Sequence, residues 1–145
     1  LRPLPLADIK EHGPGGDGII RGKLSSQPEV VEVFYPGLPG HPGRELHFSQ
    51  AEGAGGVLSF RLQNQEQARR LINSLHLPVI ASSLGAVESI VSLPATMSHA
   101  AIPEETRRKL GLTRELVRLS VGLEDFEDLQ ADLTQALEVA RLSQD

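Results

Sequence analysis

The chain contains no cysteine, no tryptophan and no excess of positive charge, and each absence excludes a class of protein. Without cysteine it can form neither disulfides nor a thiolate metal site. Its formal net charge of −5 argues against a nucleic-acid-binding surface, which requires a basic stripe. No apolar run approaches the roughly 18 residues that a membrane-spanning helix needs. We therefore expect no nucleic-acid or membrane partner and a cytoplasmic location.

The histidines and serines form no recognisable metal or hydrolase pattern. No two histidines lie four residues apart on a predicted helix, and no acidic residue completes a ligand set. Each histidine is therefore expected to be structural or on the surface, with His99 fixing a loop through side-chain hydrogen bonds: His12, His41, His47, His76 and His99. Ser83 lacks the glycine-flanked turn of a nucleophile elbow, so no Ser-His-Asp arrangement is expected. The sequence predicts neither a catalytic residue nor a metal site.

Length and apolar spacing predict a single α+β domain. The 145 residues contain only 3% aromatics, so the core should consist of Leu, Val, Ile and Ala. Periodicities of two and of 3.6 residues alternate along the chain. They predict strands at 30–34, 57–62, 78–81, 88–93 and 116–121, and helices at 41–50, at 65–76, from 103 to a stop at Gly111, and from 126 onward. Short strands and tight connections favour a mainly antiparallel sheet covered on one face by helices.

The last predicted helix carries the clearest local signals. Asp125 is placed to cap its amino end, and Glu127 and Asp128 suit its first turn. Its predicted buried face consists of Phe126, Leu129, Leu133, Leu137 and Ala140.

Residues 1–28 are predicted to be a lead-in that is flexible in part, ahead of a domain spanning 29–145. The glycine-rich stretch 12–18 reads as a loop, because proline removes a donor and glycine costs backbone entropy. Gly13, Gly15 and Gly18 match G-x-G-x-x-G as text, but no predicted strand precedes them, so a dinucleotide site is not expected. Gly22-Lys23 also fails the phosphate-loop pattern, because Leu24 follows it.

Arg118 is a charged residue in the middle of a predicted strand that is otherwise mainly apolar. Alternation along the strand 116–121 puts Val117, Leu119 and Val121 on one face and Leu116, Arg118 and Ser120 on the other. A guanidinium in an otherwise apolar strand is costly unless it meets an anion. Its planar fork suits a carboxylate. From the pattern alone, a salt bridge to Glu88 or Glu124 is favoured over a ligand.

The segments SLGAVESI, LPATMSHAAIPEE and LVRLSVGLEDFEDLQADLTQAL follow one another in this order along the chain. Together they resemble the C-terminal domain of the trans-sulfuration enzymes that use pyridoxal phosphate. The resemblance covers residues 29–140 and is strongest over 78–140, which contain the three segments. The residues of these segments are most similar to those of bacterial cystathionine β- or γ-lyases or cystathionine γ-synthase. The resemblance implies the small-domain fold of fold-type I enzymes, a sulfur amino-acid substrate of the cystathionine, homoserine-ester or methionine class, and a homo-oligomer.

The resemblance also implies roles for two residues. The family's arginine that binds the substrate carboxylate falls on Arg118, in R-L-S-V-G-x-E-D, and the serine of S-L-G falls on Ser83. It therefore favours a ligand anchor over a salt bridge at Arg118. The preceding position is Ser82, where animal γ-lyases usually carry an acidic residue.

The family's cofactor attachment is missing from this sequence. Its catalytic lysine belongs to an S-x-T-K motif upstream of the matched part, and Lys10, Lys23 and Lys109 lack that context. We therefore expect a substrate-anchoring domain of a longer enzyme that uses pyridoxal phosphate. By itself, the chain is expected to bind no cofactor covalently and to turn over nothing. An inactive interaction module and an amino-acid sensor remain as alternatives.

Overall fold

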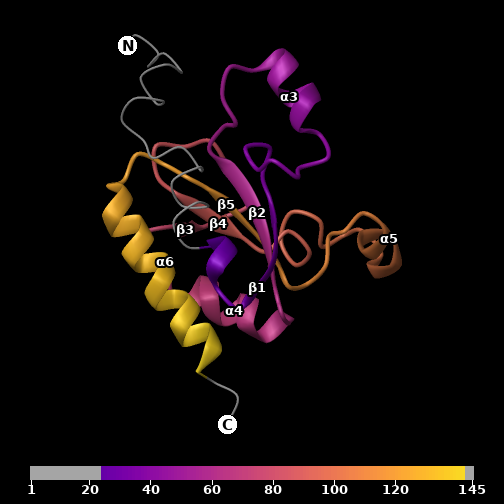
Figure 1. Ribbon diagram of the computed structural model, residues 1–145. Helices are drawn as coiled ribbons and strands as arrows, with labels where there is room; N and C mark the ends of the chain where they lie inside the picture. Colours follow the sequence, from indigo (N-terminus) through magenta and orange to yellow (C-terminus); the bar gives the residue numbers. More distant parts are fainter. Residues whose placement is uncertain (1–23, 143–145) are drawn as a thin grey trace.

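The computed structural model, which describes residues 24–142, is built on a five-stranded sheet with the strand order β1-β2-β5-β4-β3 (Figure 1). The strands are β1 (Val30–Phe34), β2 (Val57–Leu62), β3 (Val79–Ile80), β4 (Ile90–Ser92) and β5 (Leu116–Ser120). Each pair of neighbours is antiparallel except β3 and β4, which are parallel. The predicted α+β fold with a mainly antiparallel sheet is confirmed.

Two helices cover one face of this sheet. They are α4 (Gln65–Ser74) and α6 (Phe126–Arg141), which pack against each other (Figure 1). Asn64 caps α4 by accepting a hydrogen bond from the Gln67 amide at 2.9 Å. Asp125 caps α6 by accepting from the Glu127 amide, also at 2.9 Å, as predicted from the sequence. Both caps satisfy amides that have no partner inside the helix.

The core lies between the two helices and the inner face of the sheet. It is almost wholly aliphatic, as the low aromatic content predicts, and its largest members include Leu58, Phe60, Leu62, Leu71, Val91, Leu119, Leu129 and Leu137. Leu129, Leu133, Leu137 and Ala140 on α6 are buried as expected. Phe126 is only partly buried, because it lies in the first turn of the helix at the edge of the core.

The segment before β1 takes part in this core. Residues Leu24–Ser26 form a short 3₁₀ helix, η1, and the Leu24 side chain is 1% exposed among the core residues. Residues 1–23 lie outside the described part, and with them His12, Lys10, Lys23 and the glycine-rich stretch 12–18.

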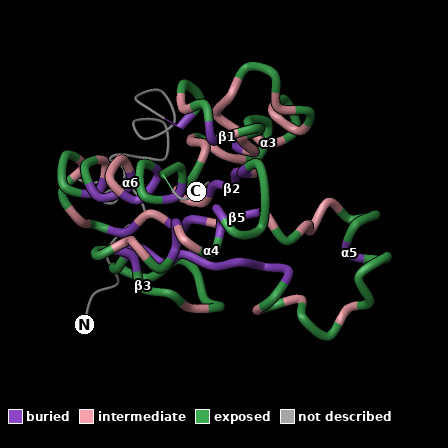
Figure 2. The backbone as a smooth tube through the Cα atoms, turned by 90° about the horizontal axis from the view of Figure 1, so that it is seen from below, coloured by how far each residue is buried: buried purple, intermediate pink, exposed green. Residues whose placement is uncertain are grey.

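Two short helices stand away from the core. Helix α3 (Arg44–Gln50) begins three residues later than predicted, because His41, Pro42 and Gly43 form a turn in which the Gly43 amide donates to His41 Nδ1. Helix α5 (Glu104–Lys109) projects from the body and is largely exposed (Figure 2). Its buried Arg107 donates to the Ala95 carbonyl, and Gly111 ends it with a positive φ of 74°.

Candidate functional site

The outer face of the sheet, opposite α4 and α6, carries Arg118 in the middle of β5. The strand alternates as predicted, since Val117 and Leu119 are fully buried in the core while Arg118 is half-buried. The residues opposite Arg118 on the neighbouring strands are Ser59 and Ser92. Because serine is short, its two neighbours leave room for the guanidinium to extend across the sheet surface.

The guanidinium reaches the loop 81–89, which joins β3 to β4. Its Nη2 donates to the Ser83 carbonyl at 3.0 Å and more weakly to the Ser82 carbonyl at 3.4 Å. No carboxylate within residues 24–142 forms an ion pair with it, so the alternative of a salt bridge to Glu88 or Glu124 is wrong for this structure. A guanidinium has five donors, so most of its donors remain free for another acceptor.

Arg118 and Ser83, the two residues singled out in the sequence, therefore lie together although 35 positions separate them. Ser83 is exposed, and its carbonyl rather than its hydroxyl contacts Arg118. Gly85 follows with a φ of 76°, a conformation that other residues rarely adopt, and its amide donates to Ser120 Oγ at 2.9 Å. The glycine of S-L-G thus turns the loop back onto β5.

The far end of the same loop is bound to the segment that follows β5. Glu124 accepts hydrogen bonds from the Ser89 amide at 2.6 Å and the Ser89 hydroxyl at 2.7 Å. The Gly122 amide donates to Ser89 Oγ at 2.9 Å. These bonds explain why the strand predicted at 88–93 is shorter in the structure: Ser89 is bound to Glu124 rather than continuing β4.

Gly122 is required by space rather than by a positive φ. A Cβ atom built there would lie 2.4 Å from the Val87 carbonyl oxygen and 2.5 Å from backbone atoms of Glu88 and Ser89. These are distances that real Cβ atoms essentially never show, and the obstacle is backbone. Only glycine allows the two segments to approach this closely.

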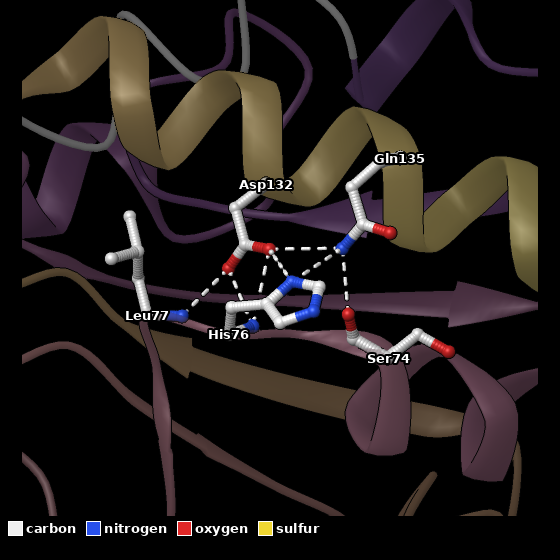
Figure 3. Close-up of polar contacts among 5 residues, drawn as sticks. All are labelled: Ser74, His76, Leu77, Asp132 and Gln135. Carbon is white, nitrogen blue, oxygen red and sulfur yellow. Dashed lines mark hydrogen bonds and ion pairs between the residues drawn. The ribbon is translucent and has the colours of Figure 1, made fainter.

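A polar cluster that the sequence did not predict binds the residues just before β3, the strand that leads into the loop 81–89 (Figure 3). Asp132, on the buried face of α6, accepts from the backbone amides of His76 and Leu77 at 2.9 and 2.8 Å. It also contacts His76 Nδ1 at 3.0 Å and Gln135 Nε2 at 2.9 Å. Gln135 in turn donates to the Ser74 carbonyl at the end of α4. The sequence did contain one sign of this cluster, because Asp132 is an acidic residue next to Leu129 and Leu133 on the apolar face of the predicted helix.

The ionisation of Asp132 reflects this cluster. Burial by itself raises the pKa of its carboxyl, but the hydrogen bonds from Leu77, His76 and Gln135 outweigh it and hold the pKa below the usual range. The carboxylate therefore stays charged and ties α6 to the chain that enters β3.

Lysine is the residue type to which pyridoxal phosphate attaches, and the described part of the chain contains Lys109 as its single lysine. Lys109 lies at the end of α5 with a side chain 73% exposed, where it pairs with Glu105 at 2.8 Å. In the described part of the chain no cluster of three or more His, Cys, Asp or Glu side chains could hold a metal ion. No helix within residues 24–142 is long and apolar enough to cross a membrane.

Comparison with known proteins places the chain among enzymes of one family. The family model described as "Cys/Met metabolism PLP-dependent enzyme" matches residues 20–138. Cystathionine beta-lyase MetC of Bacillus subtilis is 57% identical over 121 residues, which cover 83% of this chain and 31% of that protein. Cystathionine gamma-synthase 1 of Arabidopsis thaliana is 49% identical over 116 residues, or 79% of this chain and 21% of that protein.

A solved structure shares the fold. Cystathionine gamma synthase from Xanthomonas oryzae pv. oryzae, in complex with cystathionine, superposes with a TM-score of 0.83 at 38% identity, over 90% of this chain and 34% of that one. The chain thus spans about a third or less of the length of these relatives. A family match over most of the chain, together with this fold, shows that the chain belongs to the Cys/Met metabolism family of pyridoxal-phosphate-dependent enzymes.

Proposed function

We propose that this chain is the C-terminal part of a trans-sulfuration enzyme, a carbon–sulfur lyase or transferase, and that it anchors the α-carboxylate of a sulfur amino acid. Arg118 carries the proposal. It is a half-buried guanidinium whose hydrogen bonds to described residues go only to two neutral carbonyls. A partly desolvated cation without a counter-charge favours binding of an anion, and its planar fork suits a carboxylate.

Ser83 supplies the second half of the anchor. Its exposed side chain lies on the loop that Arg118 contacts, so a carboxylate bound by the free guanidinium donors meets the serine hydroxyl nearby. Two donors on different elements fix the orientation of the bound carboxylate as well as its position. The structural neighbour in complex with cystathionine, an amino acid with α-carboxylates, supports this substrate class.

The chain's share of the reaction is to bind and orient. Pyridoxal phosphate supplies the electron sink of the family's chemistry, and residues 24–142 hold no lysine placed to bind it. We therefore propose that the chain alone turns over no sulfur amino acid and that the complete enzyme is a homo-oligomer. An ultraviolet–visible spectrum of the chain with added cofactor tests the first point, since a new band of protein-bound cofactor would contradict it.

A hybrid enzyme tests the anchor directly. Residues 20–145 of this chain would replace the matching C-terminal part of the Bacillus subtilis relative, and cystathionine cleavage would be measured. Arg118→Ala should lower kcat/KM on the order of 100-fold or more, because a charge-assisted bidentate contact is lost. Arg118→Lys should recover only part of the activity, because an ammonium lacks the fork.

Arg69→Ala is the matched control. Arg69 is exposed on α4 and pairs only with Glu66 one turn away among the described residues, a contact of little energetic worth. Its variant should behave as the parent hybrid does. An inactive parent hybrid, or one in which Arg118→Ala behaves like the control, would refute the proposed function.

A further inference from the structure

The loop 81–89 carries Ser83, yet no regular secondary structure within the loop fixes the position of this serine. Residues Ser82 to Glu88 are all exposed, and they form neither helix nor strand. An exposed loop of this kind ordinarily populates many conformations, and fixing each residue costs free energy. A binding site on such a loop needs contacts that select one conformation.

Most of the contacts along the loop come from residues 118–124, and three of the side-chain contacts share one spacing. The Leu123 amide adds a backbone hydrogen bond to the Val87 carbonyl at 2.8 Å. Arg118 contacts the Ser83 carbonyl, Ser120 Oγ accepts from the Gly85 amide, and Glu124 accepts from the Ser89 amide. In each pair the two residues are 35 positions apart. Residues 83–89 and 118–124 therefore run side by side in the same direction, with side chains of one segment bonded to the backbone of the other.

Glu124 forms the shortest of these hydrogen bonds between the two segments. Both carboxylate oxygens are used, one by the Ser89 amide and one by the Ser89 hydroxyl, at 2.6 and 2.7 Å. Hydrogen bonds to a charged acceptor are short and about twice as strong as neutral ones. Ser89 is 0% exposed, and its hydroxyl also accepts from the Gly122 amide, so the donor and acceptor roles of the group are both filled.

The position of the loop sets the position of the guanidinium. Arg118 is oriented through Nη2 by the carbonyls of Ser82 and Ser83, and it has no other hydrogen-bond partner in the described part of the chain. If the loop moved away from β5, Arg118 would lose both contacts and Ser83 would leave its side. A residue that fixes the loop therefore acts on both parts of the anchor.

We infer that Glu124 is a positioning residue for the carboxylate anchor: through Ser89 it holds the loop 81–89 on the segment after β5, and so it aligns Ser83 and the Arg118 guanidinium. Glu124 itself does not touch the substrate. The inference rests on the proposed function of Arg118 and Ser83.

Kinetics of the hybrid enzyme separate positioning from a general loss of folding. Glu124→Ala should raise KM for cystathionine on the order of 10- to 100-fold, since misplacement by about an ångström can cost that much. A variant that merely folds poorly would lower the apparent kcat through fewer active molecules and leave KM unchanged. Glu124→Gln keeps one acceptor oxygen and should fall between the parent and Glu124→Ala. Glu138→Ala removes the same charge from an exposed site on α6 and should leave both constants unchanged.

Amide hydrogen exchange of the 145-residue chain provides a second readout. In Glu124→Ala the Ser89 and Gly85 amides should exchange at least about 10-fold faster, because their acceptors are lost or displaced. The Leu119 and Phe60 amides, which lie in the central strands, should keep their protection. If Glu124→Ala fails to fold, Ser89→Ala takes its place, since it removes the hydroxyl but leaves the amide bond to Glu124.

The outcomes distinguish the positioning role of Glu124 from the carboxylate anchor formed by Arg118 and Ser83. If Arg118→Ala raises KM while Glu124→Ala and Ser89→Ala do not, the positioning role is wrong and the anchor stands. If Arg118→Ala has no effect, the anchor itself is wrong. A rise in KM shared by Glu138→Ala would also overturn the inference, because it would be an effect of net charge.

Discussion

Replacing Asp132 by alanine should destabilise the protein by about 3 kcal/mol. The Asp132 side chain is only 6% exposed and accepts from two backbone amides and from Gln135, all within 2.9 Å. Hydrogen bonds to a charged group contribute roughly 1.5–3 kcal/mol each. Because His76 and Leu77 are exposed, water replaces part of the lost bonds, which reduces the sum of three such bonds to about 3 kcal/mol.

Urea unfolding of the 145-residue chain at pH 7 measures this free energy, and Asp132→Asn should lose about half as much because one acceptor oxygen remains. The pKa of Asp132 is lowered in the folded state. Its contribution is therefore present above its unfolded pKa of about 3.9 and is lost as the pH falls through the lower folded value. The stability gap between the parent and Asp132→Asn should shrink below about pH 4. A gap that stays constant from pH 7 to 3, or a loss below about 1 kcal/mol in Asp132→Ala, would refute the reasoning.

Three further substitutions test the fold around the site. Gly122→Ala should cost at least about 3 kcal/mol in urea unfolding, because its Cβ overlaps backbone, whereas Gly40→Ala, with no atom within 4 Å of its Cβ, should change little. Asn64→Ala should cost about 1 kcal/mol in the same assay, because the Gln67 amide loses its cap. Phe60→Ala should cost about 3–5 kcal/mol, since the ring is wholly buried in the core; a cost below about 1 kcal/mol would show that the core is misplaced.

The regular elements could be predicted from the sequence because their signals are local. The alternation of Val117, Arg118 and Leu119 determines which side of β5 faces the core, and the structure confirms it. The cap of α6 at Asp125 depends on amides two and three residues away, so it too is visible in the sequence. Errors appear at the ends of elements, as at the start of α3, where a turn through Gly43 displaces the first helical residue.

The polar contacts that hold the site could not be predicted, because they join residues far apart in the chain. Asp132 and His76 are 56 positions apart, and the local partner of Asp132, Gln135 on the same helix, gives no sign of the distant one. The same holds for Glu124, which the sequence offered as an ion-pair partner of Arg118 on grounds of charge alone. Its actual partner is a neutral serine, and charge counting gives no weight to a backbone amide as a competing donor.

The spacing of R-L-S-V-G-x-E-D has a physical basis that charge or hydropathy alone does not reveal. Arg118 and Ser120 lie two residues apart on β5, so their side chains point to the same face of the strand. Glu124 lies beyond the end of β5 and reaches the same neighbouring segment through Ser89. Arg118, Ser120 and Glu124 each bond to that segment at a separation of 35 positions. Gly122 allows the close approach of the segment and donates its amide to Ser89 Oγ. In the sequence, helix α5 and its flanking turns lie between the two segments, and in space the helix projects from the body of the structure (Figure 2). A change of length there would alter the separation but not the pairing, whereas one extra residue between Arg118 and Ser120 would turn the Ser120 side chain to the opposite face of β5. The spacing of the motif therefore matches a set of contacts to one neighbouring segment, in which Arg118 contacts only neutral carbonyls among the described residues.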